Sequence, residues 1–218
     1  MILAAGLGSR MRPLTNNRPK PLLEVGGKPL IVWHIEALKD AGFKEIVINV
    51  AYLGEQIIDY LGDGSQYGVK IFFSDEQHEG ALETAGGIVK ALPLLSETFL
   101  VVNGDVWTDY TYLSDFKLTK DKLVHLIVVD NPEHNLEGDF LLTGSEQRYT
   151  FSGIGYYSKQ FFNKLAINKA IEKAPLAPLL FEAENNFTLT TEYYGGHWYD
   201  IGTPERLEQL DKLLKSNF

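Results

Sequence analysis

The sequence of 218 residues contains no cysteine. Disulfide bonds and thiolate metal sites are therefore excluded, and nothing in the composition points to an oxidising compartment. Long apolar runs are missing as well, since no stretch approaches the roughly 20 residues that a membrane-spanning helix needs. The apolar start, residues 1–6, is too short for a signal peptide. We therefore expect a soluble, cytoplasmic protein without a membrane partner.

Positive charge is scarce, and the net charge is −9. Nucleic-acid-binding proteins gain most of their affinity from basic surfaces, so this balance argues against a nucleic-acid partner. The basic residues are unevenly spread: residues 1–28 hold five of them against one acid, whereas the rest of the chain holds 15 against 28. This local concentration predicts that the first segment binds a small polyanion.

Internal repeats, low-complexity tracts and convincing linkers are also lacking, while hydrophobic residues make up 44% of the chain. This length and apolar content suit one globular unit with a full core. We therefore expect residues 1–218 to form a single domain. Nothing in the sequence indicates an obligate protein partner.

Apolar patterns along the chain alternate between strand-like and helix-like segments. Strands are predicted at residues 1–5, 45–50, 69–74, 99–105, 125–130, 149–158 and 187–194. Helices are predicted at residues 29–42, 54–62, 82–92 and 203–215, the last with Thr203 as its N-cap and Pro204 in its first turn. Such alternation predicts an α/β fold, a three-layer sandwich with a mostly parallel, Rossmann-like central sheet.

The loop after the first strand lies where open α/β sheets bind ligands. Gly6 and Gly8 are not followed by the Lys-Ser/Thr pair of a P-loop, and Met11 stands where a Rossmann fingerprint needs a third glycine. What remains is a glycine-rich turn followed by a proline-stiffened basic loop. Its glycines let backbone N–H groups approach phosphate oxygens, and its basic side chains add charge-assisted hydrogen bonds. The segment therefore predicts a polyphosphate site.

Five stretches carry a resemblance to a known family: "LAAGLGSRMRPLT", "PKPLLEVGGKPLI", "LETAGGI", "VVNGDVWTD" and "GHWYDIGTPERL". Together they are similar to the signature of sugar-1-phosphate nucleotidylyltransferases, in the family's order and over nearly the whole chain. The short length, with "VNGDVWTDY", "IVVDNPEH" and "TFSGIGYY", most resembles the bacterial N-acetylmuramate-1-phosphate uridylyltransferases. The resemblance implies an enzyme of peptidoglycan recycling that joins UTP and N-acetylmuramate 1-phosphate into UDP-N-acetylmuramate and pyrophosphate.

Two alternatives stay open at this point. One is a glucose- or mannose-1-phosphate nucleotidylyltransferase that uses UTP, GTP or CTP. The other is a non-catalytic, nucleotide-sugar-binding regulatory module, which would have no need to keep two metal-binding acids. The stretch from residue 75 to residue 87 does not decide between UTP, GTP and CTP by itself.

The resemblance assigns catalytic roles to four side chains. Arg10 would grip the β- and γ-phosphates, and Lys20 would lie near the α-phosphate or the sugar phosphate. Asp105 and Asp200 would bind Mg²⁺, which prefers hard oxygen ligands. Many relatives hold the sugar phosphate with the lysine of a Val-Glu-Lys-Pro stretch, which is absent here. That phosphate would therefore be left to Lys20 and the metal.

Substrate-binding residues follow from the same resemblance. The predicted nucleotide-binding residues are Ala4, Ala5, Gly6, Gly8, Arg10, Glu76, Ala81, Glu83, Gly86 and Asn103. Glu76, Ala81 and Glu83 are the candidates for contacting the base, although Glu83 is equally suited to capping a helix. Ser152 and Gly153 would line the sugar pocket, and Arg206 would pair with the lactyl carboxylate of the sugar. Asp109 is instead expected to cap a helix after Tyr110.

Overall fold

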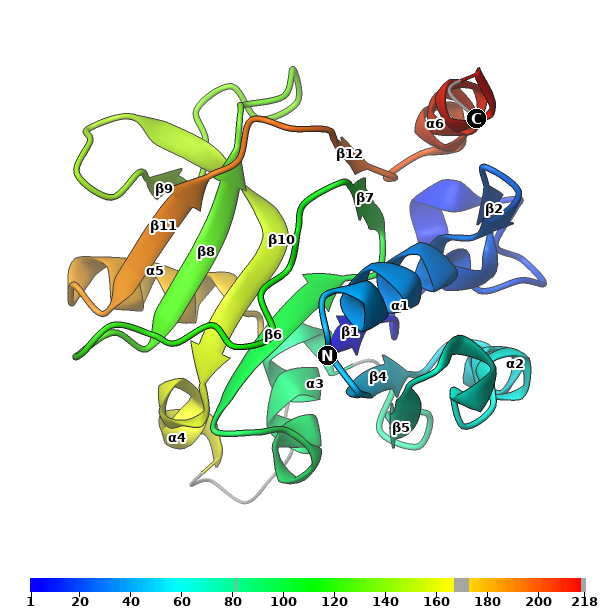
Figure 1. Cartoon of the computed structure of the whole chain (residues 1–218), viewed down its shortest axis with the longest axis horizontal. Helices are drawn as coiled ribbons and strands as arrows, with labels where there is room; N and C mark the ends of the chain where they lie inside the picture. Colours follow the sequence, from blue (N-terminus) through cyan, green and yellow to red (C-terminus); the bar gives the residue numbers. More distant parts are fainter. Residues whose placement is uncertain (81, 167–172, 217–218) are drawn as a thin grey trace. The chain divides into compact units, whose positions relative to one another are not determined.

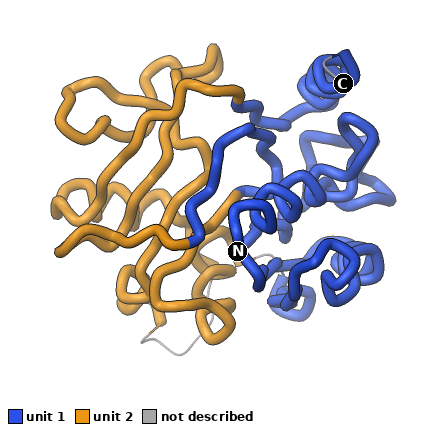
Figure 2. Tube along the Cα trace, viewed as in Figure 1, with its two compact units in different colours: residues 1–81, 103–114, 198–218 blue, residues 82–102, 115–197 orange. Residues whose placement is uncertain are grey.

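The computed structural model describes residues 1–80, 82–166 and 173–216. The chain divides into two compact units, shown in Figure 2. Unit 1 comprises residues 1–81, 103–114 and 198–218, and unit 2 comprises residues 82–102 and 115–197. The predicted fold class is confirmed: strands of a mostly parallel sheet are flanked by helices (Figure 1). The expectation of a single domain stays a prediction.

Unit 1 contains three parallel strands. They are β1 (Ile2–Leu3), β4 (Glu45–Val50) and β5 (Lys70–Asp75). Ile2 is in register with Ile48, and Ile48 with Phe73. Every residue of β4 except Glu45 is buried, as expected for a parallel strand covered on both faces. Because the three strands run in one direction, the segments that follow them begin at one edge of the sheet.

The helices of unit 1 include three of the four that the sequence predicts. They are α1 (Leu30–Asp40), α2 (Gly54–Leu61) and α6 (Pro204–Ser216). Thr203 caps α6, because its hydroxyl accepts a hydrogen bond from the backbone N–H of Arg206 at 3.4 Å. The shorter 3₁₀ helices are η1 (Ser9–Met11), η2 (Lys20–Leu22) and η3 (Ser65–Tyr67).

Two small antiparallel ribbons complete unit 1. One pairs β2 (Glu24–Val25) with β3 (Lys28–Pro29), and the other pairs β7 (Val106–Thr108) with β12 (Trp198–Asp200). A hydrophobic cluster joins the first loop to the last helix; its buried members are Met11, Leu23, Val25, Leu30, Ile201, Leu210 and Leu214. The basic loop therefore rests on a core to which the end of the chain contributes.

Unit 2 contains a mixed set of strands. They are β6 (Thr98–Asn103, of which only Asn103 belongs to unit 1), β8 (Val124–Val129), β9 (Phe140–Leu141), β10 (Arg148–Ser158) and β11 (Leu189–Tyr193). Strand β11 runs parallel to β8, whereas β10 is antiparallel to β6, β8 and β9. A β-bulge interrupts the pairing of β10 with β8 between Phe151 and Ile154.

Helices of unit 2 include one that the sequence predicts and two that it does not. The predicted one is α3 (Glu83–Ala91), and the others are α4 (Asn163–Ala166) and α5 (Ala177–Asn185). The 3₁₀ helices are η4 (Leu92–Leu94) and η5 (Lys159–Phe162). Among the described residues, no helix has the length and apolar character to span a membrane.

The expected helix after Tyr110 is wrong. Residues 109–113 form no regular element, so Asp109 has no helix to cap. Tyr110 and Tyr112 are buried and their rings meet edge to face at 5.6 Å. Alternate burial of this kind belongs to an extended segment, and this packing overrides the capping signal.

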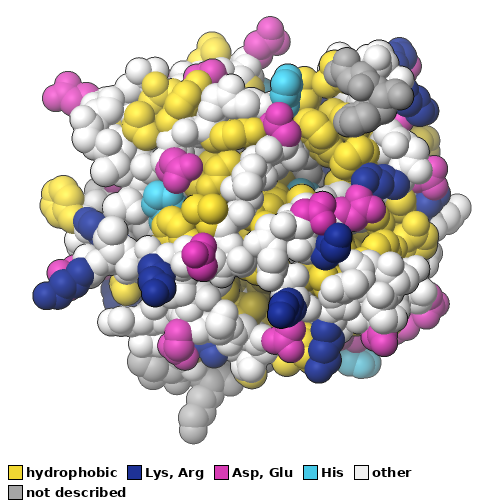
Figure 3. All heavy atoms as spheres, viewed as in Figure 1, with side chains coloured by type: hydrophobic (Ala, Val, Ile, Leu, Met, Phe, Trp, Pro, Cys, Tyr) yellow, Lys and Arg dark blue, Asp and Glu magenta, His cyan; other side chains and the backbone are white. Residues whose placement is uncertain are grey.

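Side chains of both charge signs lie on the surface of the protein. On the face that Figure 3 shows, Lys and Arg side chains are interspersed with Asp and Glu side chains. Neither sign of charge gathers into a single patch on that face.

Candidate active site

Two successive buried hydrogen bonds in unit 1 hold the start of the first loop. The backbone N–H of Ala4 donates to Oδ1 of Asn49 at 2.8 Å, and Nδ2 of Asn49 donates to Oε1 of Glu76 at 2.7 Å. All three residues are almost fully buried, where unpaired polar groups would be costly. The structure thus connects two predicted nucleotide-binding residues, Ala4 and Glu76, through Asn49, which the sequence analysis missed. A lone asparagine near the end of an apolar strand was the available signal.

The two glycines of the first loop have different surroundings. Gly8 has φ +60°, and a Cβ on it would lie 3.0 Å from Cγ2 of Thr15 and 3.3 Å from Cβ of Lys20. A side chain at Gly8 is therefore disfavoured by both backbone strain and crowding. A Cβ on Gly6, in contrast, would meet no atom within 4 Å. Gly6 thus leaves open space beside an exposed stretch of backbone, and the neighbouring Ala5 is buried.

Hydrogen bonds within unit 1 hold the loop in place. The buried Thr15 donates its hydroxyl to the carbonyl oxygen of Gly8 at 2.8 Å. The hydroxyl of Tyr52 lies 3.1 Å from the carbonyl oxygen of Thr15 and 3.0 Å from that of Asn16. The loop is therefore preorganised by its own contacts, which lowers the entropy that a ligand must overcome.

Lys20 and Asp105, which lie 85 positions apart in sequence, form an ion pair. Nζ of Lys20 is 2.9 Å from Oδ2 of Asp105. The lysine side chain is only 10% exposed, whereas the aspartate is 40% exposed. A buried lysine needs a charged partner, and Asp105 provides one while keeping an accessible face. Two predicted catalytic residues are thus in direct contact.

Backbone contacts bring the turn of Asp105 beside both β1 and β12. The N–H of Gly104 donates to the carbonyl oxygen of Leu3 at 2.9 Å, and the N–H of Ile201 donates to that of Asp105 at 2.9 Å. A Cβ on Gly104 would lie 2.5 Å from the Leu3 oxygen, so no other residue fits there without movement. These contacts place Asp105 next to the residue that follows Asp200. The sequence analysis did not single out Gly104, because only the tertiary contact reveals its role.

Three charged groups converge at Gly202, directly after Asp200. A Cβ on Gly202 would lie 3.3 Å from Nη1 of Arg206, 3.4 Å from Nη1 of Arg10 and 3.4 Å from Oδ1 of Asp200. Arg206 also donates to Oδ2 of Asp200 at 2.7 Å. Within the described part of the chain, the exposed Arg10 makes no ion pair. Two guanidinium groups therefore share the surroundings of one carboxylate, which favours an additional anion.

The two aspartates fit a divalent metal that arrives with substrate phosphates. Mg²⁺ commonly uses one or two carboxylates and completes its octahedron with phosphate oxygens and water. Asp105 and Asp200 supply two such carboxylates, 40% and 21% exposed, on adjoining segments. Among the described residues, no group of three or more His, Cys, Asp or Glu side chains could hold a metal by itself. The donor set therefore suits a metal shared with a substrate, and not an independent structural site.

His34 lies behind the Asp105 turn. Its side chain on α1 is buried and forms a hydrogen bond with the backbone of Val106. Burial lowers the pKa of His34 from 6.5 to about 4, although that hydrogen bond and the charge of Asp105 act in the opposite direction. The imidazole is therefore neutral at pH 7, as suits a packed residue of the core.

Two predicted nucleotide-binding residues of unit 2, Glu83 and Gly86, lie in α3. Glu83 is exposed and has φ +60°, a strained conformation for a residue with a side chain. No side chain caps α3, so the capping alternative for Glu83 gains no support. Gly86 is buried and its N–H donates to the carbonyl oxygen of Ala174 at 3.2 Å. Ala81 lies outside the described residues.

The predicted sugar-pocket residues Ser152 and Gly153 form the bulge of β10. The hydroxyl of Ser152 donates to the carbonyl oxygen of Ile127 at 2.7 Å and accepts from the N–H of Ile154 at 3.2 Å. Gly153 has φ +82°, which the bulge requires. Ser152 is therefore engaged inside the sheet.

Asn103, another predicted nucleotide-binding residue, is half-buried and is the last residue of β6.

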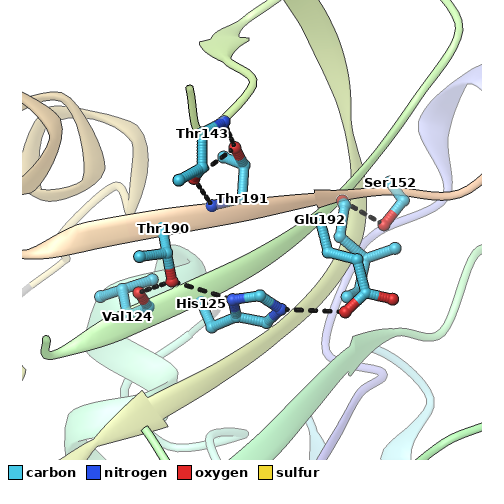
Figure 4. A network of polar contacts seen from close by, with 8 residues as sticks. Val124, His125, Thr143, Ser152, Thr190, Thr191 and Glu192 are labelled. Carbon is cyan, nitrogen blue, oxygen red and sulfur yellow. Dashed lines mark hydrogen bonds and ion pairs between the residues drawn. The ribbon is translucent and has the colours of Figure 1, made fainter. Parts of the chain in front are cut away.

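Unit 2 contains a polar network of its own, which connects β8 and β11 (Figure 4). Nδ1 of His125 is 2.9 Å from Oγ1 of Thr190, and its Nε2 is 3.3 Å from Oε2 of Glu192. The N–H and hydroxyl of Thr143 lie 2.7 Å and 3.1 Å from Oγ1 of Thr191. Burial lowers the pKa of His125, although Glu192 opposes this effect. The network links neighbouring strands and lay outside the predicted site.

Comparisons with known proteins identify the family of the chain. The family model described as "Nucleotidyl transferase" matches residues 1–140. An N-acetylmuramate alpha-1-phosphate uridylyltransferase of Neisseria meningitidis is 50% identical, over 98% of this chain and 96% of its own length. A mannose-1-phosphate guanyltransferase of Candida albicans is 33% identical, over 94% of this chain but only 61% of its own length.

Solved structures show the same fold. CTP:phosphocholine cytidylyltransferase from Streptococcus pneumoniae superposes with a TM-score of 0.73 and 28% identity, over 98% of this chain and 97% of its own. The family model covers more than half of the chain, and the relative from Neisseria meningitidis matches nearly all of it. The chain therefore belongs to the nucleotidyl transferase family of enzymes.

Proposed function

We propose that this enzyme transfers UMP from UTP to N-acetylmuramate 1-phosphate, giving UDP-N-acetylmuramate and pyrophosphate. The observation that carries the proposal is the gathering of Arg10, Lys20, Asp105, Asp200 and Arg206 in unit 1, after β1. The near full-length similarity to an N-acetylmuramate alpha-1-phosphate uridylyltransferase supports the choice of substrates. The proposal includes a role in peptidoglycan recycling in the cytoplasm, with residues 1–218 acting as one catalytic domain.

The reaction needs positioning and positive charge more than a nucleophilic side chain. An oxygen of the sugar phosphate attacks the α-phosphorus of UTP, a new P–O bond forms, and the bond to the bridging oxygen of the β-phosphate breaks. Pyrophosphate leaves with that electron pair. Negative charge is spread over many oxygens in the transition state, so preorganised cations lower the barrier.

The basic residues divide this task between them. Arg10, exposed and without an ion pair among the described residues, is suited to a forked grip on the β- and γ-phosphates. Lys20, held against Asp105 in a buried position, is suited to the α-phosphate or the sugar phosphate. Both side chains project from a loop that its own hydrogen bonds order, so little reorganisation is needed.

Asp105 and Asp200 would hold Mg²⁺, which would neutralise phosphate charge and allow the two anionic substrates to approach each other. Glu76, Ala81 and Glu83 are proposed to contact the uracil. Gly86 is proposed to let α3 approach the triphosphate closely. Ser152 and Gly153 are proposed to line the sugar pocket.

A substrate panel tests the proposal. Pyrophosphate release is measured for UTP, GTP and CTP, each with N-acetylmuramate, glucose and mannose 1-phosphates. We expect the highest kcat/KM with UTP and N-acetylmuramate 1-phosphate. The similarity to a mannose-1-phosphate guanyltransferase supplies the competing expectation. Release with mannose 1-phosphate and GTP alone would overturn the muramate assignment.

The lactyl carboxylate provides a sharper test of the sugar. Arg206 is proposed to pair with this group, which N-acetylglucosamine 1-phosphate lacks. Replacing Arg206 by glutamine should raise KM for N-acetylmuramate 1-phosphate about tenfold and leave KM for N-acetylglucosamine 1-phosphate nearly unchanged. An equal rise for both sugars would contradict this contact.

A further inference from the structure

Each carboxylate of the proposed metal site already has a basic partner in the protein. Lys20 engages Asp105 at 2.9 Å, and Arg206 engages Asp200 at 2.7 Å. The side chains of Arg206 and Asp200 are 34% and 21% exposed, so water screens this pair only in part. A metal ion that binds Asp200 must therefore displace a guanidinium group or share the carboxylate with it.

The surroundings of Gly202 make that displacement unfavourable for a metal alone. The guanidinium groups of Arg10 and Arg206 both lie within 3.4 Å of the Cβ position of Gly202, beside Asp200. A divalent cation added to this cluster would meet two like charges at short range. A nucleotide triphosphate removes the conflict, because its oxygens provide anionic partners for the metal and for both arginines.

We propose that Arg206 is a positioning residue that occupies Asp200 in the substrate-free enzyme, so that the metal binds together with the nucleotide and not before it. This inference rests on the proposed function, since it takes Asp200 as a metal ligand. It adds a role for Arg206 that precedes its contact with the sugar. An arginine suits the role, because its five donors allow it to turn from a carboxylate to a phosphate without losing its charge.

Local structure fixes Arg206 where the role requires it. The hydroxyl of Thr203 caps the first turn of α6 by accepting from the N–H of Arg206. Asp200 ends β12, and only the short connection through Gly202 separates it from the helix. The ion pair is thus set by a strand end and a capped helix start, and not by flexible surface chains.

Mn²⁺ binding to the purified enzyme tests the proposal without any turnover. Free Mn²⁺ is quantified by electron paramagnetic resonance, first without nucleotide and then with a saturating, non-hydrolysable UTP analogue. Mn²⁺ should bind nucleotide-free Arg206→Gln about tenfold more tightly than the nucleotide-free wild type. The reason is that Asp200, the proposed metal ligand, no longer accepts a charged hydrogen bond from Arg206. The factor by which the analogue tightens Mn²⁺ binding should fall correspondingly.

Two further variants serve as controls. Lys212→Gln removes the same charge from α6, but from an exposed pair with Glu208, and should leave Mn²⁺ affinity unchanged. Arg206→Lys keeps the charge and should lie between the wild type and Arg206→Gln. A tighter Mn²⁺ affinity in Lys212→Gln as well would show a general charge effect and would overturn the specific role.

Asp200→Asn separates failure of the inference from failure of the proposed function. If Asp200→Asn does not weaken Mn²⁺ binding in the presence of the analogue, the proposed metal role of Asp200 fails. If it does, but Arg206→Gln binds Mn²⁺ no more tightly than the wild type without nucleotide, only the inference is overturned. Absence of measurable binding in both proteins counts as that second outcome.

Discussion

The two units use charged side chains in different ways. In unit 1, Lys20 with Asp105 and Arg206 with Asp200 lie at strand ends and helix starts, partly open to solvent. In unit 2, both carboxylate oxygens of Asp139 accept hydrogen bonds, from the N–H of Phe151 at 2.8 Å and from Nδ2 of Asn135 at 3.0 Å. We therefore expect the acids of unit 1 to exchange their partners for a ligand, whereas both carboxylate oxygens of Asp139 are engaged beside the bulge of β10. A partly exposed acid at a strand end is thus a candidate for chemistry, and an acid whose two oxygens both accept hydrogen bonds from the protein is a candidate for a structural role.

The largest expected effect comes from neutralising Asp105. Asp105→Asn keeps the size of the side chain but removes a proposed metal ligand, so kcat/KM should fall about 10²–10³-fold. Pyrophosphate release measures the loss, and circular dichroism checks that the fold persists. Unchanged activity would remove Asp105 from the metal site and with it the contrast between the units.

Acidification should destabilise the protein through His34. Its pKa is lowered from 6.5 to about 4, so the unfolded chain binds the proton more readily than the folded one. The contribution of neutral His34 to the free energy of unfolding is fully present above pH 6.5. It is progressively lost as the pH falls from 6.5 to 4, by about 3 kcal/mol in total. Urea unfolding at several pH values measures this slope. His34→Gln cannot titrate and should show a shallower slope, and parallel slopes would contradict the assignment.

The two loop glycines should separate stability from function. Gly8→Ala should lower the free energy of unfolding by about 2 kcal/mol, because of its positive φ and its contact with Thr15. Gly6→Ala should leave stability within about 0.5 kcal/mol, because its Cβ meets nothing within the protein. It should instead raise KM for UTP, since the new methyl group occupies the space proposed for the nucleotide. A stability loss in Gly6→Ala equal to that in Gly8→Ala would contradict this division.

The smallest effect is expected at Asp139. Asp139→Asn places an amide where two donors now point at two oxygens, so one hydrogen bond is lost at a cost of about 1 kcal/mol. Activity should fall far less than in Asp105→Asn, which is the matched change in unit 1. A larger loss of activity at Asp139 than at Asp105 would reverse the comparison.

Local patterns in the sequence were enough to predict that strands and helices alternate along the chain. The helix of residues 30–40 follows from apolar spacing, and the start of α6 follows from Thr203 and Pro204. The segment after Asp109 was misread, because Tyr110 and Tyr112 owe their extended conformation to burial against the core. A capping residue carries no information about such packing.

For the site, the sequence named the charged side chains but not the residues that arrange them. Asn49, Gly104 and Gly202 act through contacts between segments far apart in the chain. No local spacing encodes a Cβ that would lie 2.5 Å from the oxygen of Leu3. The pairing of Arg206 with Asp200 was missed for a different reason, because the signature marks the acid and leaves its resting partner unspecified.

The hydrophobic cluster that joins the first loop to α6 has a consequence for synthesis of the protein. Met11 and Val25 pack with Leu210 and Leu214, and the N–H of Gly26 donates to Oδ1 of Asp211 at 2.9 Å. A nascent chain emerges from the ribosome in order, so the loop lacks its supporting helix until residues 204–216 have been translated. We therefore expect nucleotide binding to require α6, and a ribosome-stalled fragment that ends before residue 204 should not retain UTP.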